Sequence, residues 1–238
     1  MSKYPKYHDK IEFEIVYSCY YLGLHDKLKE LLEYGFNEKE VTRIEFSLLE
    51  LTNNIINPKN GIYKDDIAKI EVLEQNYNKV IRADISLVDK IYWLIEECKT
   101  YGTLPFAGVA RAGFIAVQFL RSFVAMKIIN SEEYDAYMNS LDTVSKRMNR
   151  DLKKMYVGKM SKDDFLEIYG HVRPGTYDIL SKRYDEAFEE YFGDRSFLEI
   201  EENKKVFLLS QEQLSNIQLE LDENGLCITA DELMTFIK

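Results

Sequence analysis

The stretch FLEIYGHVRPGTYDILSKRYDEAFEEYF, residues 165–192, organises this chain. Its centre, residues 170–178, has a composition that neither a helix nor a strand explains. Pro174 fixes its own φ and pushes the residue before it toward an extended conformation. Gly175 supplies the positive φ that a type II turn needs at its third position. We therefore predict a stiff loop at the centre of this stretch.

This loop concentrates polar side chains of the kinds that bind anions and exchange protons. Histidine titrates near neutral pH, and arginine offers a planar pair of donors to a carboxylate or phosphate. A stiff loop holds such groups in the fixed array that a polar substrate site requires. An alternative interpretation is structural: a Pro-Gly turn between two helices whose polar residues cap and pair with each other. The candidate site residues are His171, Arg173, Tyr177, Asp178 and Arg183.

A second informative stretch is LPFAGVARAGFIAVQFLRSFV, residues 104–124. Pro105 suits the first turn of a helix, and small residues follow on almost every side. Small residues let neighbouring backbones approach closely, so we expect this helix to be central. Arg111 in such a setting is either neutralised by a buried carboxylate or points into a cavity that binds an anion.

The runs YGHVRPGTYDILSKRYDE and YGTLPFAGVARAGFIAVQFLRSFV resemble the central region of the phosphoenolpyruvate synthase-like dikinases, which include the rifampicin phosphotransferases. The resemblance implies a modular enzyme that uses ATP and magnesium and passes phosphate through a histidine carried on another domain. This chain would be its acceptor-binding domain, which positions a small-molecule acceptor for phosphoryl transfer. Its partners would be the nucleotide-binding and phosphohistidine domains. In this interpretation His171 acts on the acceptor, and the residues that bind it are Arg111, Arg173, Tyr177, Asp178 and Arg183.

The chain lacks the other parts that such an enzyme needs. It has no glycine-rich phosphate loop of a recognised kind, and neither His8 nor His25 follows a threonine as the carrier histidine of the family does. We therefore expect a phosphotransferase module that is catalytically incomplete alone and binds no metal or cofactor itself. The alternative hypothesis is a non-catalytic helical interaction or scaffold domain.

Apolar residues at helical spacing predict a mainly α fold, a multi-helix domain with a short N-terminal strand and little sheet. The strand is expected at residues 11–17, where apolar and charged residues alternate. Asn37 with Glu40 forms a capping box for one helix, and Ser86 caps another. Two further helices are expected, over residues 131–156 and 181–192.

One domain over residues 1–238 is the expected organisation, with a possible sub-division into 1–60 and 61–238. The chain ends inside a helical pattern, which indicates a piece of a longer multidomain enzyme.

Composition limits the partners and the compartment. A net charge of −10 argues against binding to nucleic acid or to an anionic membrane, because both need a cationic surface. The three cysteines are widely spaced and fit reduced thiols. No uninterrupted apolar run is expected to span a membrane. Cytoplasmic residence is therefore the expectation.

Overall fold

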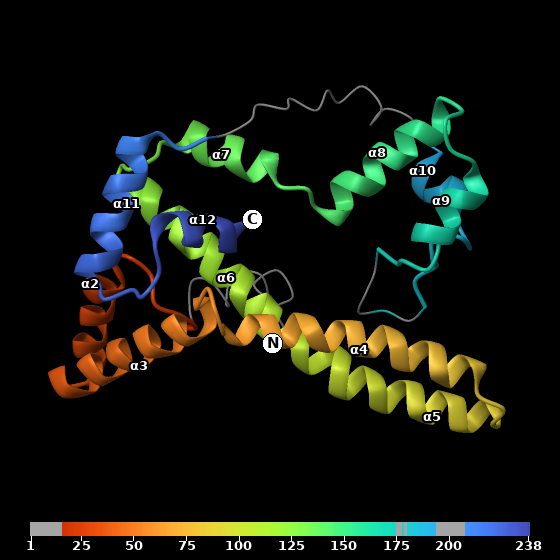
Figure 1. Ribbon diagram of the computed structural model, residues 1–238, viewed down its shortest axis with the longest axis horizontal. Helices are drawn as coiled ribbons and strands as arrows, with labels where there is room; N and C mark the ends of the chain where they lie inside the picture. Colours follow the sequence, from red (N-terminus) through yellow and green to blue (C-terminus); the bar gives the residue numbers. More distant parts are fainter. Residues whose placement is uncertain (1–15, 175–177, 179, 194–207) are drawn as a thin grey trace. The chain divides into compact units, whose positions relative to one another are not determined.

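The computed structural model describes residues 16–174, 178, 180–193 and 208–238. The chain is mainly helical, as predicted, and the described residues contain no strand (Figure 1). Most of the strand expected at residues 11–17 lies outside the described residues, and Val16 and Tyr17 have no regular structure. The chain divides into two compact units, residues 1–134 with 208–238 and residues 135–207, and each is described by itself.

Unit 1 contains a series of helices and two short helical segments of other types. The 3₁₀ segment is η3 (Lys29–Tyr34), and the π-helical segment is η4 (Cys98–Thr103). The α-helices are α2 (Leu24–Leu28), α3 (Glu38–Ile56), α4 (Ile62–Arg82), α5 (Leu87–Glu97), α6 (Leu104–Ala125), α11 (Gln211–Glu223) and α12 (Ala230–Ile237).

The predicted caps at the starts of α3 and α5 are confirmed. The Asn37 side chain accepts a hydrogen bond from the backbone of Glu40, whose carboxylate accepts one from the Asn37 backbone. Ser86 accepts from the backbone N–H of Asp89 at 3.1 Å. Each side chain satisfies a donor that the first helical turn leaves unpaired, so each fixes where its helix begins.

Helix α6 is the central helix of unit 1, as its small residues predicted. Its inward side includes Ile115, Phe119 and Phe123, which are completely buried. Segments distant in sequence close around it: Gln213 on α11 donates to the carbonyl of Ile128 at 3.2 Å. Figure 1 shows α12 beside α6, with which it is in contact, although the two helices are far apart in the chain.

One helical run joins α5, η4 and α6 without a break, from Leu87 to Ala125. Pro105 lies in the first turn of α6 and lacks an N–H, so the preceding turn cannot continue the regular α-helical ladder. The wider π turn at Cys98–Thr103 accommodates this interruption.

This run is 39 residues long and is apolar enough to cross a membrane by length and composition, contrary to the expectation from the sequence. One such helix is weak evidence for a membrane span, because the core helix of a soluble protein passes the same test. Of the most apolar 18-residue window in this run, 33% is buried inside the protein.

Unit 2 contains α8 (Val144–Tyr156), α9 (Lys162–Tyr169) and α10 (Phe188–Phe192), and α7 (Ser131–Ser140) crosses its first boundary. The single helix expected over residues 131–156 is therefore divided, because Thr143 caps a new helix through the N–H of Lys146. A helix was also expected over residues 181–192, and only the last five residues of that stretch form one. The core of unit 2 is aromatic and consists of Leu152, Phe165, Tyr169, Phe188 and Phe192.

Candidate functional site

The loop singled out by the sequence leaves the end of α9 and returns toward α10, both in unit 2. Its base is closed by two backbone hydrogen bonds: Tyr184 donates to Val172 at 3.0 Å, and Asp185 donates to Gly170 at 3.1 Å. A Cβ at Gly170 would lie only 3.1 Å from the Cβ of Asp185, so glycine permits this approach. We call residues 170–186 the Gly170 corner. The two bonds fix the ends of the corner, and the turn predicted at Gly175 lies outside the described residues.

The two groups expected to meet a substrate lie near the start of the corner. His171 is exposed, and Arg173 is half-buried. Glu186, at the far end of the corner, has its pKa lowered chiefly by the hydrogen bond from the backbone N–H of Arg183, and also by the charges of Arg183 and Arg173. The Arg173 guanidinium therefore lies close enough to the base of the corner to stabilise a carboxylate there.

Arg183 is engaged by neighbouring carboxylates. Its guanidinium pairs with Asp185 at 2.9 Å and with Glu186 at 3.4 Å. The Asp178 carboxylate accepts from the backbone N–H of Leu180 at 2.9 Å, which is a local turn contact. Tyr177 lies outside the described residues. Arg183 and Asp178 thus have structural roles sufficient to explain their presence.

Arg111 lies on α6 and belongs to unit 1, whereas the other candidate residues belong to unit 2. Its side chain is exposed, so neither of the enclosed settings expected for it applies. Close approach of another helix occurs one turn earlier, at Gly108, where a Cβ would overlap the carboxylate of Asp66 on α4. The small residues around Arg111 therefore serve helix packing.

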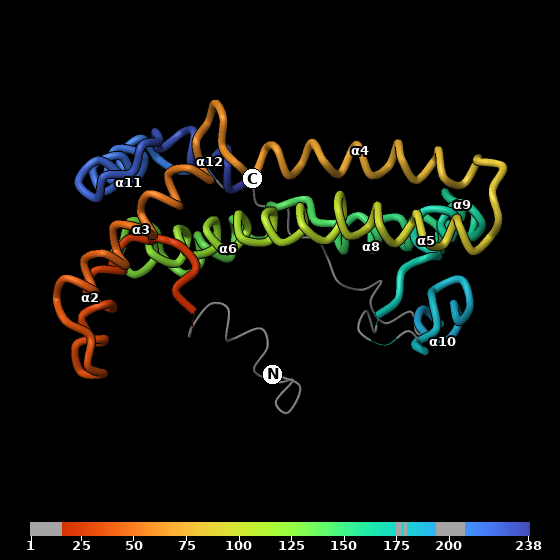
Figure 2. The backbone as a smooth tube through the Cα atoms, turned by 90° about the horizontal axis from the view of Figure 1, so that it is seen from below, coloured from red at the N-terminus to blue at the C-terminus, as the bar shows by residue number. Residues whose placement is uncertain are grey.

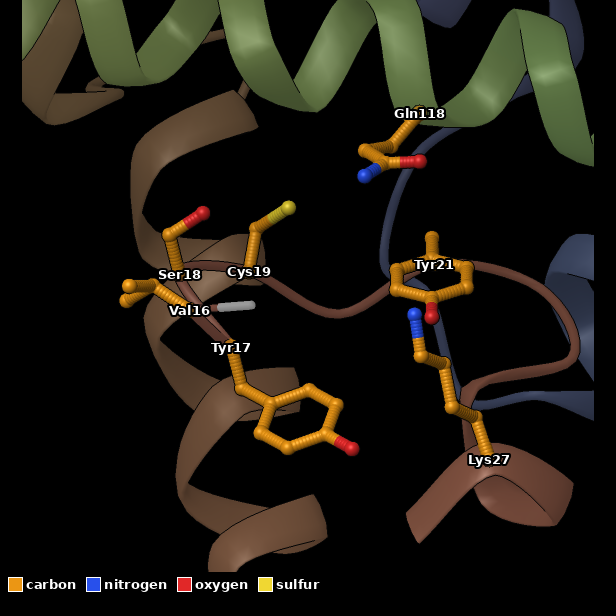
Figure 3. Close-up of a pocket in the computed structure, with 7 residues that line it drawn as sticks. All are labelled: Val16, Tyr17, Ser18, Cys19, Tyr21, Lys27 and Gln118. Carbon is orange, nitrogen blue, oxygen red and sulfur yellow. The ribbon is translucent and has the colours of Figure 1, made fainter. Parts of the chain in front are cut away.

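A small pocket, with room for about one water molecule, lies elsewhere in unit 1 (Figure 3). Figure 3 shows Gln118 of α6 over the pocket, with Tyr21 and Lys27 on one side and Cys19 on the other. Burial raises the pKa of Cys19 to about 11, so its thiol is protonated at neutral pH and is a poor nucleophile. Burial likewise raises the pKa of Tyr21 to about 12. Apart from Lys27, the pocket thus offers uncharged groups.

Sequence reasoning missed this pocket, because the run SCYYLGL at residues 18–24 gives no signal beyond that of an apolar segment. A second hollow lies along one helix only, α3, and is wide and open. Neither hollow is lined by a described residue of the Gly170 corner. Over the described part of the chain, no three His, Cys, Asp or Glu side chains are grouped so that they could hold a metal ion.

Comparisons with protein-family models, with curated proteins and with solved structures find no match to this chain.

Proposed function

We propose that this chain is the acceptor-binding helical domain of a phosphoenolpyruvate synthase-like phosphotransferase. The observation that supports the proposal most is the Gly170 corner, whose backbone is closed at its base while His171 remains exposed. A closed base fixes the positions of His171 and Arg173, and phosphoryl transfer depends mostly on positioning and on neutralising charge.

In this proposal Arg173 binds an anionic group of the acceptor, because its planar guanidinium makes two parallel hydrogen bonds to a carboxylate or phosphate. His171 hydrogen-bonds the acceptor or exchanges a proton with it. ATP, magnesium and the phosphohistidine belong to other domains of the complete enzyme, which would also supply the remaining wall of the acceptor pocket. A cytoplasmic location is part of the same proposal, since the metabolites of such an enzyme are found there.

Binding titrations by calorimetry test the proposal, with phosphoenolpyruvate, pyruvate and inorganic phosphate as probes. Loss of the guanidinium in Arg173→Ala is expected to weaken binding of an anionic probe by about 10-fold or more. The matched control is Arg43→Ala, which removes the same charge from an exposed position on α3 in unit 1. Equal affinities for the wild type, Arg173→Ala and His171→Ala would remove the corner from the site.

A second candidate function is a non-catalytic interaction module, which the exposed apolar side chains of α4 and α5 favour. Helix α5 has no buried residue, and Ile91, Trp93 and Ile95 are each about half exposed. Thermal unfolding separates the two candidates at the corner. A purely structural corner predicts that Arg173→Ala lowers the melting temperature markedly, whereas an acceptor site predicts little loss of stability and a large loss of binding.

A further inference from the structure

Helices α4 and α5 form an antiparallel hairpin within unit 1 (Figure 2). Contacts identify the seam between α4 and the run that follows it: Asn76 donates to Glu97 at 2.7 Å. Farther along the seam, a Cβ at Gly102 would lie 3.4 Å from the side chain of Leu73. These contacts place Leu73 and Asn76 of α4, and Glu97 of α5, at the inward heptad positions. Heptad spacing adds Leu94 and Lys90 of α5, and Lys90 donates to the carbonyl of Ile81 on α4 at 2.8 Å.

The heptad register then shows which side chains share one side of the hairpin. The inward positions of each heptad are a and d. In an antiparallel pair of helices, positions b and e of both helices lie on the same side of the pair. On α4 these positions hold Ile67, Ile70, Tyr77 and Ile81, with Glu74 between them, and on α5 they hold Val88, Ile91 and Ile95. We call these seven apolar residues the apolar hairpin face.

The apolar hairpin face is exposed, and the other side of the hairpin is mostly polar. The exposed fractions of its side chains run from 43% for Ile81 to 74% for Val88. The corresponding positions on the other side are mostly polar: α4 has Asp65, Gln75, Lys79 and Arg82 there, with the smaller apolar residues Ala68 and Val72, and α5 has Asp89 and Glu96, with the large apolar Trp93. A one-sided apolar surface of this kind marks an interaction site.

We propose that a second copy of this chain covers the apolar hairpin face, so that two hairpins pack together as four antiparallel helices. At roughly 100 Å² of exposed area per side chain, a symmetric pair would bury roughly 1,400 Å², within the ~1,200–2,000 Å² of stable specific interfaces. The face is two helices wide, and an identical hairpin matches that width, whereas a single helix does not. A two-fold axis brings the same residues together from both copies, as closed symmetric dimers require.

A lipid bilayer fits the face less well than a second copy does. Glu74 interrupts the α4 part of the face; a protein interface holds water and polar groups that solvate such a carboxylate, and hydrocarbon does not. The net charge of −10 also opposes approach to anionic headgroups. This inference rests on the interaction-module candidate, for which it names the partner, and it is independent of the acceptor site.

Sedimentation velocity on the full chain, from about 1 to about 200 µM, tests the proposal. The wild type is expected to shift with concentration from one copy of 28.0 kDa to two. Ile91→Asp places an unpaired charge in the interface and is expected to weaken association by about 100-fold or more. Trp93→Asp is the matched control: Trp93 is 50% exposed against 51% for Ile91, lies on the same helix, and faces the other side.

Three results would overturn the second copy as partner: a wild type that stays monomeric throughout, a dimer that Ile91→Asp leaves intact, or one that Trp93→Asp disrupts equally. Binding of the monomer to phosphatidylcholine vesicles that Ile91→Asp abolishes would assign the face to lipid instead. Binding of an apolar dye distinguishes the remaining cases. If the protein is a monomer and Ile91→Asp reduces its dye binding, the interaction module stands and the second copy as partner is excluded. If the protein is a monomer and Ile91→Asp leaves dye binding unchanged, both are excluded.

Discussion

At the scale of single residues, Gly108 decides how closely α6 approaches α4. A Cβ at this position would overlap the carboxylate of Asp66, which is buried and pairs with Lys69 at 3.1 Å. Gly108→Ala is therefore expected to lower the free energy of unfolding by about 1–3 kcal/mol, because the buried Asp66 side chain or one of the two helices must shift. Chemical denaturation measures this change.

Gly113 on the same helix provides the control. An added Cβ there meets nothing within 4 Å, so Gly113→Ala is expected to stabilise the protein by about 0.5–1 kcal/mol through helix propensity. In the double variant Gly108→Ala/Asp66→Ala, part of the loss should return. Equal effects of the two glycine substitutions would contradict the close contact between α4 and α6.

A second prediction at this scale concerns acid stability in unit 2. The hydrogen bond from Lys154 lowers the pKa of Asp151, with a further contribution from the Tyr169 hydroxyl, which donates to Asp151 at 2.9 Å. A carboxyl whose pKa is lower in the folded state stabilises the protein above its unfolded pKa of about 3.9, and that contribution is lost as the pH falls through the folded value.

Tyr169→Phe removes one cause of the lowered pKa. We expect it to reduce stability by roughly 0.5–1.5 kcal/mol near neutral pH. The loss of stability between about pH 5 and pH 2 should also become shallower than in the wild type. Urea denaturation at a series of pH values measures both effects, and an unchanged acid limb would show that Asp151 gains nothing from the tyrosine.

The polar residues of the Gly170 corner could be found from sequence, but the closure of its base could not. Pro174 and Gly175 indicated a turn, which is local backbone chemistry. The pairing of Arg183 with Asp185 and Glu186 is also local, since the partners lie two and three positions along the chain. The backbone hydrogen bond from Asp185 to Gly170 depends on how the chain returns to α9, and no spacing rule gives it. The setting of Arg111 could not be predicted either. Its small neighbours indicated close packing, but they did not show which side of α6 is exposed.

At the scale of elements, helix starts were predictable and helix continuity was not. Asn37 and Ser86 act through bonds within one turn, so their sequence signature is complete. Thr143 also caps a helix, but it lies within an apolar pattern that continues from α7 into α8, and the pattern predicted a single helix. Pro105 was predicted to begin a helix, whereas a π turn lets the helix continue through it.

The exposure of α5 leads to a prediction about hydrogen exchange. Helix α5 buries no residue, whereas α6 buries Phe119 and Phe123 completely. In Ile91→Asp, amides of α5 should therefore exchange much faster than those of α6, because opening α5 exposes little additional apolar area. In the wild type at high concentration, α4 and α5 should gain protection. Equal exchange of α5 and α6 in Ile91→Asp would contradict a weakly packed hairpin.

At the scale of the whole molecule, the two units have separate cores. Phe165 is completely buried in the aromatic core of unit 2, and Phe119 is completely buried in unit 1. Phe165→Ala and Phe119→Ala are each expected to cost about 3–5 kcal/mol, but in different units. Calorimetry combined with segment-resolved hydrogen exchange should show each substitution lowering the stability of its own unit. Equal destabilisation of both units by either substitution would show one cooperative core.

Unit 1 combines two segments that are far apart in the chain, and the sequence does not show that they belong together. Asn53 on α3 receives the backbone N–H of Cys227 at 2.8 Å and donates to Gly225 at 3.0 Å, so the end of the chain closes onto its first quarter. The sequence suggested only a possible division near residue 60. The hydrogen bond between Asn53 and Cys227 joins residues 174 positions apart, and the sequence gives no sign of it.

Nuclear magnetic resonance of the histidine side chains tests whether the Gly170 corner receives an anionic acceptor, as we propose. The chain has three histidines, and His25 pairs with Glu45 in unit 1 at 2.9 Å, where it serves as an internal control. During titration with phosphoenolpyruvate, the imidazole signals of His171 should shift saturably while those of His25 stay in place, and Arg173→Ala should abolish the shift. Signals of His171 that do not move, or that move together with those of His25, would contradict the claim.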